Sequence, residues 1–442
     1  MAVLVVWLLL GLVMGLLQWP YQALSELGFR LQRWLWPLPG LEGGHGGIAQ
    51  GLPPGLGAVL VFAASALLIW LAWGPLAAGR GGGVAPLLAL DRSGRQVPPE
   101  AEAHWLEKLS LASQLQRLPL MLLTHLGGLT VGVESPSVAL GASVLLATRR
   151  RWPGCTPLAQ LPSSLVAVIG GAAGLGAAFR SPLLAVAYGL EELGQRSGLS
   201  LVLPALLLAG SGSVVATAMG QPARLPGLEL GGLAPALWGW AMLLTLVGAA
   251  AGALLVRLLI PAAAWVKRLL ARRRLGGALL LAGLLTLLAL ASGGLSLNDG
   301  SLSLGSALAG GDGGPSLTLL WRTLATVLSL AAGAPGGLMH DSMTLGALLT
   351  SPLRSHAGLG ATELAQLAAV GATALFASAH GSPLFCAAFV FTLQGDPALL
   401  PALLLVSAIS GALGERWRGE GWNEHQCQAL IDQAPGATPS SR

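Results

Sequence analysis

Charged residues are scarce in this chain of 442 residues, since Asp, Glu, Lys and Arg together make up only 10% of it. A soluble globular domain carries about 25% of these residues, because they cover its water-facing surface. Hydrophobic residues account for 54% of the sequence. The charge is too sparse to solvate a protein of this size, so we expect the lipid bilayer to surround it.

Metal-binding and catalytic patterns are also lacking. The three cysteines are scattered, with neither the spacing of metal ligands nor an even number for disulfides, and we interpret them as small buried residues: Cys155, Cys386 and Cys427. There is no HExxH or GxSxG motif and no histidine and serine at the spacing of an intramembrane serine protease. We therefore expect no enzyme activity, no metal and no cofactor.

The net charge of +5 does not indicate a nucleic-acid partner, because the basic residues gather in short clusters at the ends of apolar segments. These clusters lie at 149–151, 267–268 and 272–274. Clusters of this kind are typical of cytoplasmic loops in membrane proteins.

Long apolar runs are present, and a spanning helix needs about 20 such residues. Four runs qualify, at 52–76, 199–219, 237–256 and 275–291. Residues 3–17 lack the basic start and cleavage pattern of a signal peptide, so we interpret them as the start of a retained helix. Shorter runs are interrupted by the 63 Gly and 28 Pro. The sequence predicts an all-α integral membrane protein of tilted, broken and re-entrant helices.

An internal duplication is the most informative feature. The segment GVESPSVALG at 132–141 resembles GLMHDSMTLG at 337–346, and AFRSPL at 178–183 resembles AHGSPL at 379–384. The two offsets, 205 and 201 residues, nearly agree and keep the same order. Repeated halves are common in transporters, where the substrate lies between them near the midplane. We expect a first half at 1–220, a second half at 221–422 and a short polar tail at 423–442.

Glycine-rich loops precede both copies of the first repeated segment, at 127–128 and 333–337. A helix N-terminus carries partial positive charge and unpaired N–H groups, so converging helix starts bind an anion without a basic side chain. Packing glycines between helices are the alternative. Glu134 opens one of these predicted helices, and an ionisable group inside a membrane indicates function. Its alternative role is a helix-start carboxylate stabilised by the helix dipole.

These segments resemble a known family. GGLTVGVESPSVALG at 127–141 is similar to the GREGP region of the CLC chloride channels and transporters, and GAPGGLM at 333–339 is similar to their GIFAP region. Residues 174–192 and 371–396 resemble the helix pairs that follow each region. The resemblance implies an inverted repeat without CBS domains, a homodimer with one anion pathway per subunit, and a multi-pass location in a bacterial inner membrane.

The resemblance also implies roles for individual residues. Glu134 takes the position of the gating glutamate, Glu192 that of the inner glutamate that passes protons, and Glu191 that of its neighbour. A Glu191–Glu192 pair facing cytoplasmic water is the alternative. The expected anion-binding positions are Gly82, Gly132, Val133, Leu338, Met339 and Trp422.

Several positions depart from the family pattern. Gly82 replaces a serine whose hydroxyl binds the central anion, and Val133 replaces an arginine. Trp422 falls at the inner-gate tyrosine, where it either donates its indole N–H to an anion or lies in an interfacial aromatic belt. In the GIFAP region, His340 and Asp341 replace an apolar pair; we expect Asp341 to face away and pair with a base, or His340 to titrate.

Together, these observations predict transmembrane transport of chloride or another small anion. Proton-coupled antiport gated by Glu134 is the leading hypothesis, with protons as the second substrate. A passive anion channel on the same scaffold and a transport-inactive family member are the alternatives.

Overall fold

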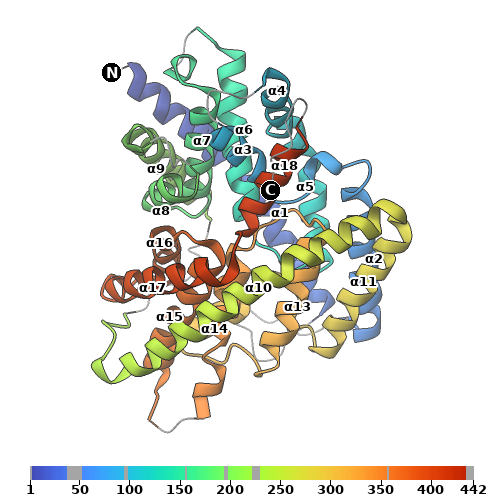
Figure 1. Ribbon diagram of the computed structural model, residues 1–442, viewed down its shortest axis with the longest axis vertical. Helices are drawn as coiled ribbons and strands as arrows, with labels where there is room; N and C mark the ends of the chain where they lie inside the picture. Colours follow the sequence, from blue (N-terminus) through green and yellow to red (C-terminus); the bar gives the residue numbers. More distant parts are fainter. Residues whose placement is uncertain are drawn as a thin grey trace.

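The computed structural model describes residues 2–36, 52–93, 98–154, 157–193, 198–221, 229–355 and 358–434. Regular structure in these ranges is helical, and its elements are shown in Figure 1. The earlier helices are α1 (Ala2–Leu35), α2 (Pro54–Ala72), α3 (Ala85–Ser93), α4 (Pro99–Lys108), α5 (Leu111–Leu126), α6 (Glu134–Arg151), α7 (Ser163–Ala178), α8 (Pro182–Tyr188) and α9 (Val202–Ala218). The later helices are α10 (Trp238–Arg272), α11 (Arg274–Ala291), α12 (Ser301–Leu308), α13 (Thr318–Ala331), α14 (Met339–Leu348), α15 (Ala361–His380), α16 (Pro383–Gln394), α17 (Leu400–Arg418) and α18 (Trp422–Asp432).

Four segments are long and apolar enough to cross a membrane, and they comprise most of α1 together with α2, α10 and α11. Three of the four predicted spans coincide with α2, α10 and α11, and residues 3–17 lie in α1. The fourth, 199–219, contains α9, which at 17 residues is shorter than these. Large apolar side chains are exposed on the long helices, including Val59 (60%), Leu254 (56%) and Leu287 (62%). Lipid is the solvent that such a surface needs, so the protein is a multi-pass membrane protein.

The duplicated segments fold alike. Helices α6 and α14 begin at Glu134 and Met339, and α8 and α16 begin at Pro182 and Pro383, which reproduces the offsets of 205 and 201 seen in the sequence. Each copy also packs in the same way. Gly141 of α6 lies against the backbone of Gly170 in α7, and Gly346 of α14 lies against the backbone of Gly371 in α15. A Cβ at any of these glycines would collide with the facing carbonyl oxygen, so the close packing of helix pairs depends on them.

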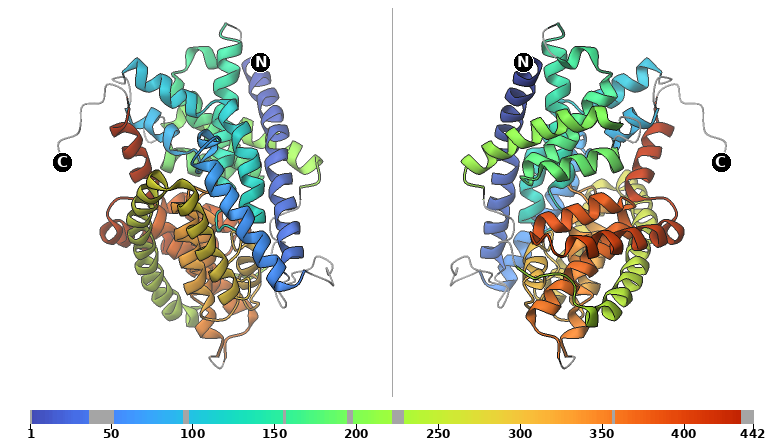
Figure 2. Two further views of the ribbon diagram at one scale, coloured as in Figure 1. Left: turned by 90° about the vertical axis from the view of Figure 1, so that its right-hand side faces the viewer. Right: turned by 90° about the vertical axis from the view of Figure 1, so that its left-hand side faces the viewer.

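The earlier and later helices meet at the middle of the molecule. Figure 2 shows the blue-to-green helices and the orange-to-red helices as two groups, with α10 lying along the outside of the second. Contacts cross between the groups where α11 packs on α2, α16 on α8, and α18 on α3. This arrangement brings helix starts that are far apart in sequence to one central region.

Most of the helix α18 lies within the polar segment that follows residue 422. Trp422 and Cys427 are buried on one face of this helix, which packs against α3. The average composition of the segment is polar, and it hides this narrow apolar face. Cys386 is buried, as predicted for a small apolar residue, and Cys155 lies outside the described residues.

Candidate functional site

Two helix starts are held side by side at the centre of the molecule. Gly132 and Gly337, which precede α6 and α14, exchange backbone hydrogen bonds of 3.3 and 3.1 Å. The loops that lead into this contact turn at Gly128 and Gly333, whose φ values are +65° and +82°. Such φ values favour glycine, which explains the paired glycines in the sequence. The free N–H groups of both first turns therefore face one small region.

Glu134 is the first residue of α6 and is fully buried. Its carboxylate folds back over Gly132, and Oε1 lies 3.3 Å from Nδ1 of His340 on the first turn of α14. Within the described part of the chain, neither carboxylate oxygen has a hydrogen bond. Glu134 therefore lies between the two helix starts, with His340 as its nearest charged or ionisable contact.

Gly82 lies directly beside these helix starts. The N–H of Gly81 donates to the carbonyl of Gly333 at 3.1 Å. A Cβ at Gly82 would lie 2.5 Å from Cβ of Ser135 and 2.9 Å from the carbonyl oxygen of Gly336. A serine would not fit at Gly82 unless both Ser135 and the backbone at Gly336 moved, because real Cβ atoms do not approach other atoms this closely.

Ser135 places a hydroxyl in the same region. It follows Glu134 on the first turn of α6, and only 4% of it is exposed. Among the described residues, its hydroxyl makes no hydrogen bond. A missing hydroxyl at Gly82 is thus accompanied by an unpaired hydroxyl next to it.

The other predicted anion-binding positions border the same region. Val133 and Leu338 are 2% exposed and Met339 is fully buried, so their backbone groups are shielded from bulk solvent. Leu338 also borders a polar cavity of about 220 Å³ that extends to Glu192 and Trp422. Trp422 is 8% exposed and lines this cavity, which excludes a place on the lipid-facing surface.

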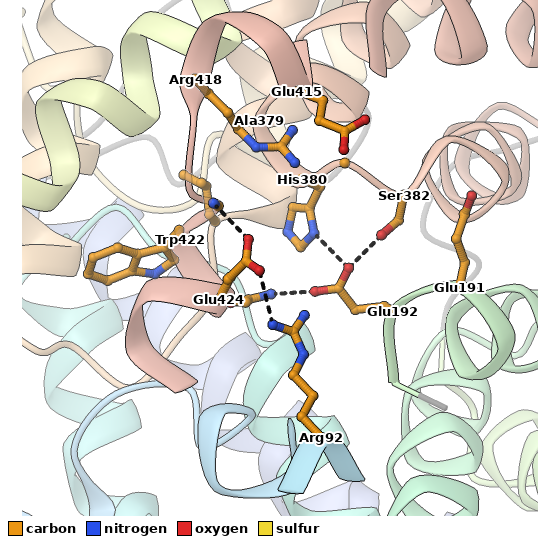
Figure 3. A pocket seen from close by; sticks show the side chains of 14 residues that line it. Arg92, Glu191, Glu192, Ala379, His380, Ser382, Glu415, Arg418, Trp422 and Glu424 are labelled. Atoms are coloured by element: carbon orange, nitrogen blue, oxygen red, sulfur yellow. Dashed lines mark hydrogen bonds and ion pairs between the residues drawn. The ribbon is translucent and has the colours of Figure 1, made fainter. Parts of the chain in front are cut away.

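Figure 3 shows the polar cavity, in which charged side chains of both signs meet. The cavity is lined by the predicted residues Glu191 and Glu192, and also by Arg92, Glu415, Arg418 and Glu424. Arg92 donates to Glu424 at 3.3 Å, and this contact joins the end of α3 to α18. The cavity is thus bounded by elements from both groups of helices.

Glu192 is the most connected carboxylate of the cavity. It accepts hydrogen bonds from Ser382 Oγ at 2.5 Å and from Asn423 Nδ2 at 2.9 Å. Nδ1 of His380 lies 3.9 Å from the carboxylate oxygen that Ser382 contacts (Figure 3). The ring of His380, at the end of α15, lies within ion-pair range of this carboxylate. The contacts hold Glu192 at the edge of the cavity.

Glu191 has a different geometry. Its carboxylate accepts hydrogen bonds from the backbone N–H groups of Leu384 at 3.2 Å and Phe385 at 2.7 Å, in the first turn of α16. These are unpaired donors at a helix start, so Glu191 caps α16 from a neighbouring element. Its predicted part in proton transfer stays a prediction.

Asp341 pairs with a base, as predicted. Its Oδ1 lies 3.6 Å from Nη2 of Arg322 on α13, and both side chains are buried. Arg322 also donates to the carbonyl oxygens of Leu295 (2.8 Å), Leu297 (3.2 Å) and Asn298 (2.7 Å). Arg322 therefore fixes the loop before α12 against the start of α14.

Sequence reasoning missed four of these residues. Ser135, Ser382 and Asn423 are short polar residues of ordinary types at helix starts, and no spacing in the sequence marks them. Arg322 did leave a signal, because it is a single charge inside the otherwise apolar segment of α13.

The sequence and the fold are both similar to known proteins. The family model described as voltage gated chloride channel matches residues 62–415, whereas no curated protein sequence matches the chain. A slow cyanobacterial Cl⁻/H⁺ antiporter has a similar structure, with a TM-score of 0.75 and 20% identity over 98% of this chain and 99% of its own. A CLC-type fluoride/proton antiporter gives a TM-score of 0.68 and 20% identity over 94% and 96% of the two chains. A eukaryotic CLC transporter gives 0.66 and 19% identity over 97% and 74%.

At these identities the structural likeness establishes the fold, and the family model covers most of the sequence. The chain therefore belongs to the voltage-gated chloride channel (CLC) family.

Proposed function

We propose that this CLC protein exchanges chloride or another small anion for protons across the membrane, with Glu134 as the gate of the anion pathway. The observation that carries the proposal is the position of Glu134. Its carboxylate is fully buried between the starts of α6 and α14, where an anion would be bound. A carboxylate there competes with the anion while it is ionised and releases the position when a proton neutralises it.

The anion site itself is supported by backbone geometry. The Gly132–Gly337 hydrogen bonds align two helix starts, and the N–H groups near Leu338 and Met339 supply donors to an anion. The Ser135 hydroxyl adds a donor from α6. The direct donors to the negative ion are thus backbone N–H groups and a hydroxyl, which keep binding weak enough for release.

The polar cavity supports a route from this site to one face of the protein. It reaches from Leu338 and Trp422 to Glu192 and on to charged residues at its rim. An anion passing Trp422 could accept a hydrogen bond from its indole N–H. Glu192 borders the same cavity, where it could receive a proton from water and begin its transfer toward Glu134.

A passive anion channel is the second candidate, and the contacts of Glu192 favour it. Both carboxylate oxygens accept hydrogen bonds, from Ser382 and Asn423, and His380 lies near one of them. Donors of this kind stabilise the ionised form and oppose proton uptake. If Glu192 stays ionised during transport, anions cross without protons.

We also propose a homodimer with one pathway per subunit. Apolar side chains are exposed on neighbouring elements from both groups of helices, including Leu183 on α8, Leu203 on α9 and Leu384 on α16. A second copy would cover this surface within the bilayer.

Reconstituted liposomes test the function. An outward chloride gradient should drive protons uphill into liposomes that contain the wild-type protein, and no proton movement with intact chloride flux would identify the channel. Glu134→Ala should abolish proton movement and leave chloride flux, whereas Glu107→Ala, which removes an exposed glutamate of α4, should change neither. Proton coupling that persists in Glu134→Ala would contradict the gate, and absence of any anion flux in the wild type would contradict transport.

A further inference from the structure

His340 makes the closest contact that an ionisable side chain makes with Glu134 among the described residues. Its Nδ1 lies 3.3 Å from Glu134 Oε1, and 3% of the histidine and none of the glutamate side chain is exposed. The two residues come from α14 and α6, the two helices whose starts border the proposed anion site. The contact therefore joins the gate to the opposite half of the protein.

The hydrogen bond of the other ring nitrogen, Nε2, indicates which nitrogens of His340 carry a proton. Nε2 is 3.1 Å from Ser301 Oγ, and both the hydroxyl and the backbone N–H of Ser301 donate to Asp299 Oδ1, at 2.7 and 3.0 Å. The single proton of the hydroxyl is used on Asp299, so Ser301 must accept from His340 and Nε2 carries a proton. Nδ1 then carries a proton only when the ring is an imidazolium.

The charges around His340 decide between the neutral and the charged ring. It contacts Glu134 from α6, and Ser301 connects it to Asp299 in the loop before α12. Its neighbour on α14, Asp341, pairs with Arg322 from α13. Helix α15, which packs on α14, carries titratable side chains only at its ends, at Glu363 and His380. Three carboxyl groups thus share one guanidinium in a buried region, and such an imbalance favours a second cation.

We propose that His340 is a positioning residue for the gate: as an imidazolium, it holds the ionised Glu134 in the closed position by an ion pair. This inference rests on the proposed role of Glu134. Opening then requires a second proton. That proton binds the Glu134 carboxylate and forms an O–H bond, the imidazolium keeps both of its own protons, and the neutral carboxyl loses the attraction that held it.

The pairing has a measurable consequence for the pH at which the protein opens. A positive charge within about 4–6 Å changes the pH at which a carboxyl titrates by about 1–3 units, because it favours the ionised form. Without His340, the Glu134 carboxylate loses this attraction and leaves the closed position more readily. The gate would then open at higher pH than in the wild type.

The pH dependence of chloride flux in liposomes, with equal pH on both sides, tests the inference. We expect His340→Gln to raise the pH of half-maximal flux by about one unit or more, as the general effect of a nearby charge implies. The control His425→Gln removes a histidine that pairs with Glu420 at 3.0 Å near the start of α18, and it should leave the profile unchanged. The proposal would be overturned if His340→Gln changed the chloride flux by the same factor at every pH and left the pH of half-maximal flux unchanged.

Two further measurements separate failure of this inference from failure of the proposed gate. Glu134→Gln should abolish the pH dependence, and adding His340→Gln to it should cause no further shift. If Glu134→Gln leaves the profile unchanged, the gate itself is wrong; if only His340→Gln fails to shift it, the positioning role is wrong. ¹⁵N NMR of histidine-labelled protein in nanodiscs reads His340 directly: wild type should show both ring nitrogens protonated, and Glu134→Gln should lose the Nδ1 proton. An unprotonated Nδ1 in the wild type would overturn the inference even if a variant fails to fold.

Discussion

The unpaired hydroxyl of Ser135 gives the sharpest prediction about anion binding. If it donates to the anion, Ser135→Ala removes one hydrogen bond to a charged group, which contributes about 1.5–3 kcal/mol. This corresponds to a loss of roughly 10- to 100-fold in anion affinity. The stability of the protein should not change, because within the described residues the hydroxyl has no protein partner to lose.

Isothermal titration calorimetry of the purified protein with chloride measures the affinity, and thermal denaturation measures the stability. Ser143→Ala is the matched control on the same helix. The hydroxyl of Ser143 donates to the carbonyl of Ala139 at 2.7 Å and accepts from Gln114 at 2.9 Å. Its removal should lower stability and leave anion affinity unchanged.

Exchanging the hydroxyl between two positions extends the test. Gly82→Ser alone should impair folding or binding, because its Cβ would lie 2.5 Å from Cβ of Ser135. Adding Ser135→Gly removes this collision but leaves the 2.9 Å approach to the carbonyl oxygen of Gly336, so it should recover part of the anion binding with the hydroxyl on the other loop. If Ser135→Ala keeps wild-type affinity, or if it destabilises the protein as Ser143→Ala does, then Ser135 packs within the protein and does not bind the anion.

Three predictions concern stability. Arg322→Ala leaves buried Asp341 unpaired, so the free energy of unfolding should fall by about 3–5 kcal/mol in chemical denaturation; a loss below about 1 kcal/mol would show that this pair is not holding the loop. Gly141→Ala forces a Cβ into the backbone of Gly170 and should destabilise by about 1–3 kcal/mol, whereas Gly239→Ala in α10, where the added Cβ has open space, should not lower the melting temperature. Asp396, in the loop outside the membrane-spanning helices, accepts from the N–H groups of Ala398, Gly231 and Leu230, which lower its pKa. A lowered folded-state pKa gives stability that is present above the unfolded pKa of about 3.9 and is lost as pH falls through the folded value. Asp396→Asn should therefore melt at a lower temperature than wild type at pH 6 but lose less stability below about pH 4, and parallel pH profiles would contradict this.

The membrane-spanning helices and the starts of the repeated helices could be predicted from the sequence, because each depends on a local sequence pattern. The long apolar runs indicated α2, α10 and α11, and the duplicated segments placed helix starts at Glu134 and Met339. The sequence also offered pairing of Asp341 with a base as one of two expectations, and the structure shows this pair. Each of these predictions uses the residues of a short segment and general physical chemistry, and none requires knowledge of contacts between distant segments.

The remaining features depend on contacts between distant segments. Nothing in the sequence shows that Asn423 reaches Glu192 or that Ser135 lies beside Gly82, because these neighbours are brought together only by packing of the two groups of helices. Glu191 illustrates the same limit: its role as a cap depends on the start of α16, nearly 200 residues away. The apolar face of α18 was not recognised in the sequence, because most residues of this helix are polar.

The proposed anion site is formed by the backbone N–H groups at the starts of α6 and α14. Crystals grown or soaked in bromide test it most directly, since anomalous scattering locates the ion. We expect a bromide peak within hydrogen-bond distance of the backbone N–H of Leu338 or Met339 and of the Ser135 hydroxyl, and a stronger peak in Glu134→Gln. Bromide found only beside the arginines of the polar cavity, with none between the two helix starts, would contradict it.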